Sequence, residues 1–127
     1  MDKAALVNLE LVNAEKMLAA MDSAELGISV AALAFITVYN GFRLVIASRK
    51  LDAEGLLQRH HLINVALRAA GIGGLDEPSF LIMKTTDPFI RDLKRAFGKT
   101  KDVCGARLGG QSFGDWYVED GIVYRIS

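Results

Sequence analysis

Two Asx-Gly dipeptides, Asn40-Gly41 and Asp120-Gly121, constrain the fold more than any other feature of this sequence. Each lies between runs rich in β-branched and aromatic residues, FITVY and FRLVI around the first and WYVE and IVYRI around the second. A type I′ turn needs positive φ at both central residues, which asparagine, aspartate and glycine tolerate. The sequence therefore predicts two β-hairpins, each with a two-residue turn.

The register of the first predicted hairpin follows from counting outward from its turn. The pairs expected on one face are Tyr39 with Phe42, Thr37 with Leu44 and Phe35 with Ile46. The other face carries smaller apolar side chains, which suits packing against a helix. We therefore expect the sheet to be covered on both faces.

Helical patterns flank these strands. Residues 53–70 repeat apolar side chains at helical spacing and end before a glycine. Asp87 suits the N-cap of a later helix, Pro88 suits its first position, and Gly98 follows its last apolar residue. Between these two helices, FLIMKTT predicts a buried strand.

An apolar helical pattern also covers residues 4–21, so the predicted order of elements is αββαβαββ. This order predicts an α+β fold in which one mainly antiparallel sheet of about five strands packs with three helices. No linker divides the chain, so residues 1–127 are expected to form a single domain.

Charge and cysteine content limit the classes of partner and compartment. The chain has 15 basic and 15 acidic residues, so its net charge gives no general attraction to nucleic acid or to an anionic membrane. Its single cysteine, Cys104, cannot form an internal disulfide, which favours the cytoplasm. The longest apolar run, residues 30–39, is about half of the roughly 20 residues that a spanning helix needs, so no membrane span is expected.

The segment KTTDP holds the best candidates for contact with an anion. Lys84, Thr85 and Thr86 could join the free amides at the start of the following helix in holding one. Asp87 competes with such a ligand, because a carboxylate at the N-cap occupies the same amides. Capping is favoured over ligand binding, and both interpretations stay open.

The same predicted helix carries a basic face formed by Arg91, Lys94 and Arg95. Residues 43–101 contain eleven bases and six acids, so this half of the chain is the more positive one. A solvated helix face is favoured over a phosphate-binding patch, because Asp92 and Asp102 dilute the charge. Nucleic-acid binding or processing through this face is therefore the alternative function. The favoured function is that of a non-catalytic binding or regulatory module.

No pattern indicates catalysis, a metal or a cofactor. His60 and His61 are adjacent in a predicted helix and point about 100° apart, so they do not converge on one ion. Cys104 has no local motif of a nucleophile. A weaker enzyme hypothesis would gather His60, Lys84 and Asp87. The acidic residues near the chain end suit turns better than a metal-dependent nuclease: Asp115, Glu119 and Asp120.

The first predicted helix has apolar stripes on two sides. The stripe considered for a homodimer interface includes Val7, Leu11, Ala14, Leu18 and Met21. A second stripe consists of Ala5, Leu9, Val12, Ala19 and Ala20. The chain's own sheet can cover one stripe, and a second copy about a twofold axis would cover the other. The sequence does not decide which stripe meets the partner.

Three stretches carry a resemblance to known proteins: FRLVIASRKLD, DPFIRDLKRAFG and YVEDGIVYRIS. Together they resemble segments of a group of small uncharacterised bacterial proteins. The resemblance covers most of the chain and implies one bacterial domain. It implies no activity, cofactor or site residue.

These observations favour a small cytoplasmic protein without catalytic activity that acts as a binding or regulatory module. We expect a homodimer, and the sequence does not identify a ligand, small-molecule or otherwise. Nucleic-acid binding through the basic helix face is the alternative.

Overall fold

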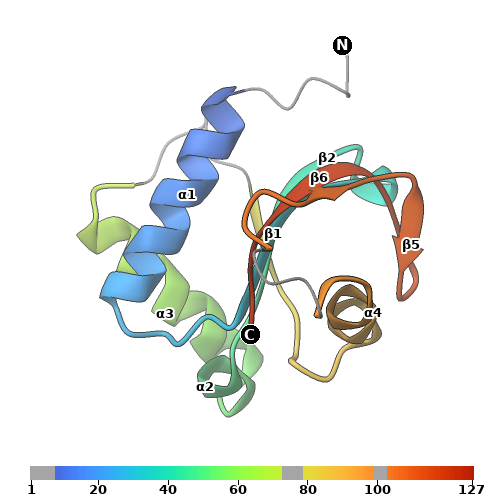
Figure 1. The fold of residues 1–127 in the computed structure, drawn as a ribbon. Helices are drawn as coiled ribbons and strands as arrows, with labels where there is room; N and C mark the ends of the chain where they lie inside the picture. Colours follow the sequence, from blue (N-terminus) through green and yellow to red (C-terminus); the bar gives the residue numbers. More distant parts are fainter. Residues whose placement is uncertain (1–7, 73–78, 99–102) are drawn as a thin grey trace.

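The computed structural model describes residues 8–72, 79–98 and 103–127, and Figure 1 shows how their helices and strands are arranged. The elements are α1 (Asn8–Ser23), β1 (Val30–Ile36), a 3₁₀ turn η1 (Thr37–Tyr39), β2 (Gly41–Ala47), α2 (Arg49–Asp52), α3 (Leu56–Ala69), β3 (Ser79–Ile82), α4 (Pro88–Phe97), β4 (Arg107–Leu108), β5 (Gln111–Phe113) and β6 (Trp116–Ile126). The α+β class is confirmed, with three substantial helices and one mostly antiparallel sheet.

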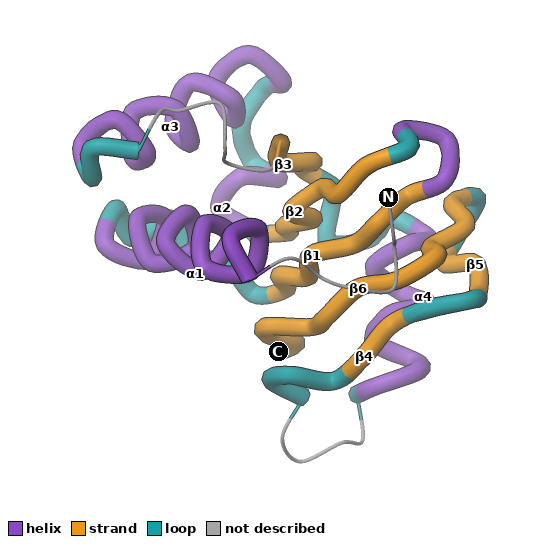
Figure 2. The backbone as a smooth tube through the Cα atoms, turned by 90° about the horizontal axis from the view of Figure 1, so that it is seen from above, coloured by secondary structure: helices purple, strands orange, loops and turns teal. Residues whose placement is uncertain are grey.

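The strands form a six-stranded sheet in the order β3-β2-β1-β6-β4, and β5 also pairs with β6 (Figure 2). β1 is antiparallel to both of its neighbours, β2 and β6. β3 is parallel to β2, because α2 and α3 carry the chain back across the sheet between them. The sheet is thus mixed, with its parallel pair at one edge.

Helices cover the sheet on both faces, as the apolar character of both hairpin faces predicts. Figures 1 and 2 show α1 and α3 on one side and α4 on the other. All seven residues of β1 are buried, because this central strand is covered above and below. Burial on both faces explains why its sequence, VAALAFI, is apolar at every position.

Two cores lie on the two faces. The α1–α3 core contains buried residues of both helices and of the facing strands, among them Met17, Met21, Leu33, Leu44, Ile46 and Ile63. The α4 core contains Ile36, Val45, Phe89, Ile90, Leu93, Phe113 and Val123. The side chains of successive residues in each central strand therefore pack in opposite cores.

The first hairpin forms, but its two-residue turn does not. Residues 37–40 make the connection, and Phe42 lies opposite Phe35 where Tyr39 was expected. Only Asn40 has the left-handed conformation, at φ 49°, whereas Gly41 is the first residue of β2. The register is displaced by four residues, an even number, so the predicted division of the side chains between the two faces survives.

The second hairpin was placed at the wrong dipeptide. β6 runs without a break through Asp120 and Gly121 and pairs with β1 along its length. The turn lies earlier, where Phe113 is paired with Trp116 and Gly114 has φ +59°. Glycine at the first of two central positions is typical of a type II′ turn.

The later helices largely agree with the sequence. The side chain of Asp87 accepts a hydrogen bond from the Phe89 amide (2.9 Å), Pro88 is at the first position, and Gly98 is the C-cap, so all three predictions for α4 are confirmed. α3 begins at Leu56, because a separate short helix, α2, precedes it. The strand predicted in FLIMKTT forms as β3, which begins one residue earlier, at Ser79; it is an edge strand and only partly buried, not buried as predicted.

The first stripe of α1 packs inside the chain. Ala14, Leu18 and Met21 are buried in the α1–α3 core, and Leu11 is partly buried against it. Val7 lies outside the described residues. This stripe therefore covers the chain's own sheet.

The second stripe of α1 is partly open to solvent. Val12 is 45% exposed and Ala19 is exposed, whereas Ala20 is buried. A homodimer through α1 would accordingly use the Val12 side, and the homodimer itself stays a prediction. None of the helices in the described part of the chain combines the length and the apolar character needed to cross a bilayer.

Candidate functional site

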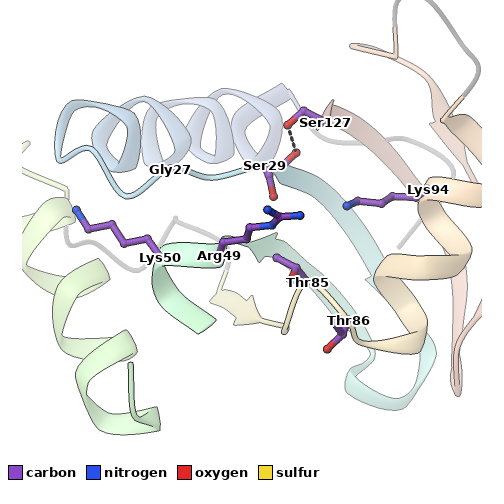
Figure 3. Close-up of a pocket in the computed structure, with 8 residues that line it drawn as sticks. All are labelled: Gly27, Ser29, Arg49, Lys50, Thr85, Thr86, Lys94 and Ser127. Carbon is purple, nitrogen blue, oxygen red and sulfur yellow. Dashed lines mark hydrogen bonds between the residues drawn. The ribbon is translucent and has the colours of Figure 1, made fainter. Parts of the chain in front are cut away.

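A basic pocket of about 570 Å³ opens beyond the C-terminal ends of β2, β3 and β6 (Figure 3). Its walls come from five separate parts of the chain: the α1–β1 connection, α2, the β3–α4 loop, α4 and the end of the chain after β6. The lining residues are Gly27, Ser29, Arg49, Lys50, Thr85, Thr86, Lys94 and Ser127. Three of the eight have cationic side chains, and none has an acidic or an apolar side chain.

The pocket lies where the sheet topology favours a binding site. β2 and β3 are parallel neighbours, so their C-terminal ends lie side by side next to the pocket. From the end of β2 the chain passes to α3 on one face, whereas from the end of β3 it passes to α4 on the other. In open sheets with parallel strands, ligands bind in the crevice outside such a divergence of connections. Arg49 follows β2 and Thr85 follows β3, so both stand at this point.

Two cations approach each other across the pocket. Figure 3 shows the Arg49 side chain reaching into the hollow from α2 and the Lys94 side chain reaching toward it from α4. Neither side chain has an ion pair or a hydrogen bond with another described residue. Two facing like charges repel each other, and an anion between them would remove that repulsion. Lys50 points away from them and donates to the Glu25 carbonyl (3.0 Å).

Asp52 and Thr85 join the two halves of the pocket. The Thr85 hydroxyl donates to Asp52 Oδ2 (2.6 Å), and the Thr85 amide lies 3.2 Å from the same oxygen. These bonds fasten the β3–α4 loop to α2. They also occupy the Asp52 carboxylate, which is therefore engaged elsewhere than with Arg49.

Ser48 fastens the wall formed by the α1–β1 connection. Its hydroxyl donates to the Leu26 carbonyl (2.6 Å) and accepts a bond from the Leu51 amide as the N-cap of α2. Gly27 comes next to Leu26 with φ +66°, a conformation that favours glycine. The α1–β1 connection is thus tied to the helix that carries Arg49.

The C-terminal wall is held by an ion pair. Arg125 lies 2.8 Å from the Asp22 carboxylate and also donates to the Ile28 carbonyl (3.0 Å). The hydrogen bond from Arg125 lowers the pKa of Asp22, with the charge of Arg125 acting in the same direction. Beyond it, the Ser127 amide and hydroxyl both donate to the Ser29 carbonyl.

The structure divides the six residues predicted to contact a ligand or anion. Thr85, Thr86 and Lys94 line the pocket. Lys84, Arg91 and Arg95 are exposed outside it, and Arg95 forms a loose ion pair with Asp92 (3.5 Å). As predicted, Asp87 caps α4 by accepting from the Phe89 amide, and no residue of 87–90 lines the pocket.

Sequence reasoning missed Arg49 and Ser29. The signal that could have found Arg49 is the pair of basic residues directly after an apolar strand, in IASRK. Its meaning depends on the parallel pairing of β2 with β3, which no local pattern reveals.

The residues of the enzyme hypothesis lie apart from this pocket. His60 is exposed on α3, with Nδ1 3.0 Å from the Leu56 carbonyl, and Cys104 is exposed in the loop before β4. Lys84 and Asp87 do not line the pocket either. Within the described segments, no group of three or more His, Cys, Asp or Glu side chains is placed to hold a metal ion.

Comparison of the chain with protein-family models, curated proteins and solved structures finds no match. The resemblance to small bacterial proteins therefore stays a prediction. What the pocket binds has to be inferred from its own residues and geometry.

Proposed function

We propose that this protein is a non-catalytic module that binds a small anionic ligand in the basic pocket between α2 and α4. One observation carries the proposal: Arg49 and Lys94 face one pocket from different layers, and no lining side chain is acidic. A structural role for these two cations would require partners within the chain. An anionic ligand is the partner that this arrangement favours.

The lining also supports a polar ligand over an apolar one. Small-molecule sites commonly have volumes of about 300–1,000 Å³, and this pocket of about 570 Å³ is within that range. Hydrogen bonds from guanidinium and ammonium groups to anionic oxygens are roughly twice as strong as neutral ones. The ligand's affinity would therefore come mainly from charge.

Inorganic phosphate is a suitable first probe, with thermal and urea unfolding as the readout. At about 100 times its dissociation constant, a ligand specific for the folded state raises the free energy of unfolding by about 2.7 kcal/mol. We expect such a rise for the wild type and none for the double variant Arg49→Ala/Lys94→Ala.

The matched control is Arg91→Ala/Arg95→Ala, which removes two exposed cations near the pocket but outside it. The control should keep the full response to phosphate. Without ligand, the pocket variant should be at least as stable as the wild type, because it removes two facing like charges. An equal response of both double variants would contradict the proposal.

Nucleic-acid binding is the second candidate, favoured by the exposure of Arg91 and Arg95 on one side of α4. A gel-shift titration at physiological salt separates it from the first. Non-specific binding under these conditions has dissociation constants of about 10⁻⁴ to 10⁻⁶ M. Sub-micromolar binding that is lost in the Arg91→Glu/Arg95→Glu variant would favour the nucleic-acid function.

We further propose that the module works as a homodimer in the cytoplasm. The partly exposed Val12 side of α1 supports the dimer, and an exposed free cysteine, Cys104, suits a reducing compartment. Light scattering at high micromolar concentration should give twice the monomer mass. A monomer mass there would contradict the dimer and leave the pocket proposal intact.

A further inference from the structure

We infer that the ligand of the basic pocket is a small phosphomonoester bound as its dianion. This inference rests on the proposed function and specifies the class of anion. It follows from the number of unpaired charges, from the directions in which donors enter the pocket, and from the chemistry of its walls.

The charge of the pocket matches a dianion. Arg49, Lys50 and Lys94 give the lining three positive charges, and the α-carboxylate of Ser127 gives it one negative charge, so its net charge is +2. Asp52 does not line the pocket and is hydrogen-bonded to Thr85. A phosphomonoester carries close to two negative charges near neutral pH, because its second pKa is about 6. A carboxylate or a phosphodiester carries only one, and would leave one of the facing cations unbalanced.

The donors also enter from directions that suit a tetrahedral group. Arg49 enters from α2 and Lys94 from α4, and their charged ends face each other across the hollow, whereas the Thr86 hydroxyl on the β3–α4 loop points away from them (Figure 3). Guanidinium binds two phosphate oxygens side by side, whereas ammonium acts as a point charge. A terminal phosphate offers three oxygens, two for the guanidinium of Arg49 and one for the ammonium of Lys94, whereas a carboxylate offers only two.

The walls favour a small molecule over a lipid. None of the eight lining residues has an apolar side chain that could hold an acyl chain. The exposed large apolar residues on α3 and on the β1–β2 hairpin do not line the pocket: Val38, Tyr39, Leu56, Leu57 and Val65. The ordinary size of the pocket likewise suits a phosphorylated small molecule.

Amide NMR titration of the full chain at pH 8 can test the inference with matched probes. Methyl phosphate, dimethyl phosphate and acetate differ in charge and in number of free oxygens, and methyl phosphate is a dianion at this pH. We expect methyl phosphate to bind at least about ten times more tightly than the other two, since it can engage both cations. Its titration should shift the amides of Gly27, Ser29, Thr85 and Thr86.

Variants then assign the preference to the two cations. Arg49→Ala and Lys94→Ala should each reduce the preference for methyl phosphate over dimethyl phosphate to less than about threefold, because one charge remains. Arg49→Lys should keep part of the preference, since it keeps the positive charge but loses the paired N–H donors of the guanidinium. Arg91→Ala should keep all of it. The wild-type comparison needs no variant, so it stands even if a variant fails to fold.

Each contrary result has a distinct meaning. Equal affinity for the three probes would overturn the phosphomonoester and leave the proposed anion-binding function in place. No shift with any of them, or with inorganic phosphate, would overturn both. Binding to a phosphoserine peptide or to vesicles containing phosphatidic acid, with no binding of methyl phosphate or glycerol 3-phosphate, would overturn the small-molecule ligand.

Discussion

Asn40-Gly41 and Asp120-Gly121 are chemically similar pairs in different surroundings. Asn40 follows the 3₁₀ turn at the exposed tip of the first hairpin, and Gly41 opens β2 with φ outside the left-handed region. Asp120 and Gly121 are both buried within β6. The first pair is at a hairpin tip with Asn40 outside the paired strands, whereas the second lies between β1 and β4.

The difference teaches that neighbouring strands can override a local turn preference. At Gly121, an added Cβ would lie 2.5 Å from the Leu33 carbonyl oxygen and 3.1 Å from the Ala34 Cα. Glycine is needed there because β1 approaches closely, which is a known role of glycine inside a strand. The same residue type that favours a turn elsewhere here allows a continuous strand.

Replacing Gly121 with alanine should have the largest effect. The clash is with backbone atoms of β1, which cannot move away as a flexible side chain would. We expect the free energy of unfolding to fall by about 3 kcal/mol, measured by urea denaturation. A loss below about 0.5 kcal/mol would mean that the close approach does not limit this position, and the contrast with Gly41 would disappear.

Arg107→Met should have the next largest effect. Arg107 lies 2.6 Å from Asp120 Oδ1, and the second carboxylate oxygen is buried with no hydrogen-bond partner among the described residues. Removing the cation leaves a buried carboxylate without its counter-charge. Because Arg107 itself is 57% exposed, we expect a loss of only about 1 kcal/mol by urea denaturation.

Arg95→Met is the matched control for this variant. Its ion pair with Asp92 is longer, at 3.5 Å, and exposed on both sides. Exposed pairs contribute little, so the loss should stay below about 0.5 kcal/mol. Equal losses in the two variants would show that Asp120 does not depend on Arg107.

Gly41→Ala should have a small effect. The new Cβ would lie 3.4 Å from a terminal guanidinium nitrogen of Arg43, at the end of a flexible side chain. The backbone is not left-handed, so we expect a change within about 0.5 kcal/mol in thermal or urea unfolding. A loss above about 2 kcal/mol would support the two-residue turn instead.

Asn40→Gly should have the smallest effect. Asn40 has φ 49° and ψ 44°, a left-handed conformation that asparagine tolerates better than most residues. Glycine removes the remaining cost but loses more entropy on folding, so the two effects nearly cancel, to within about 0.3 kcal/mol. A larger gain on urea unfolding would show that the tip is strained.

The sequence predicted best where a structure depends on neighbours along the chain. The start of α4 depends on Asp87 and Pro88, which act within one helical turn, and both roles were confirmed. In the pocket, Thr85 and Thr86 were found because they precede that helix start, and Lys94 because it belongs to the predicted basic face of the same helix. Arg49 was missed because its place opposite Lys94 depends on the pairing of β2 with β3.

The sequence by itself determined the α+β class, the bounds of α4 and the sharing of strand side chains between two faces. These features follow from caps and from apolar periodicity, which act over a few residues. Tertiary structure decided the register at Asn40-Gly41, the passage of β6 through Asp120-Gly121 and the meeting of Arg49 with Lys94. Each depends on which distant strands lie side by side, because pairing and burial across the sheet outweigh local turn preferences.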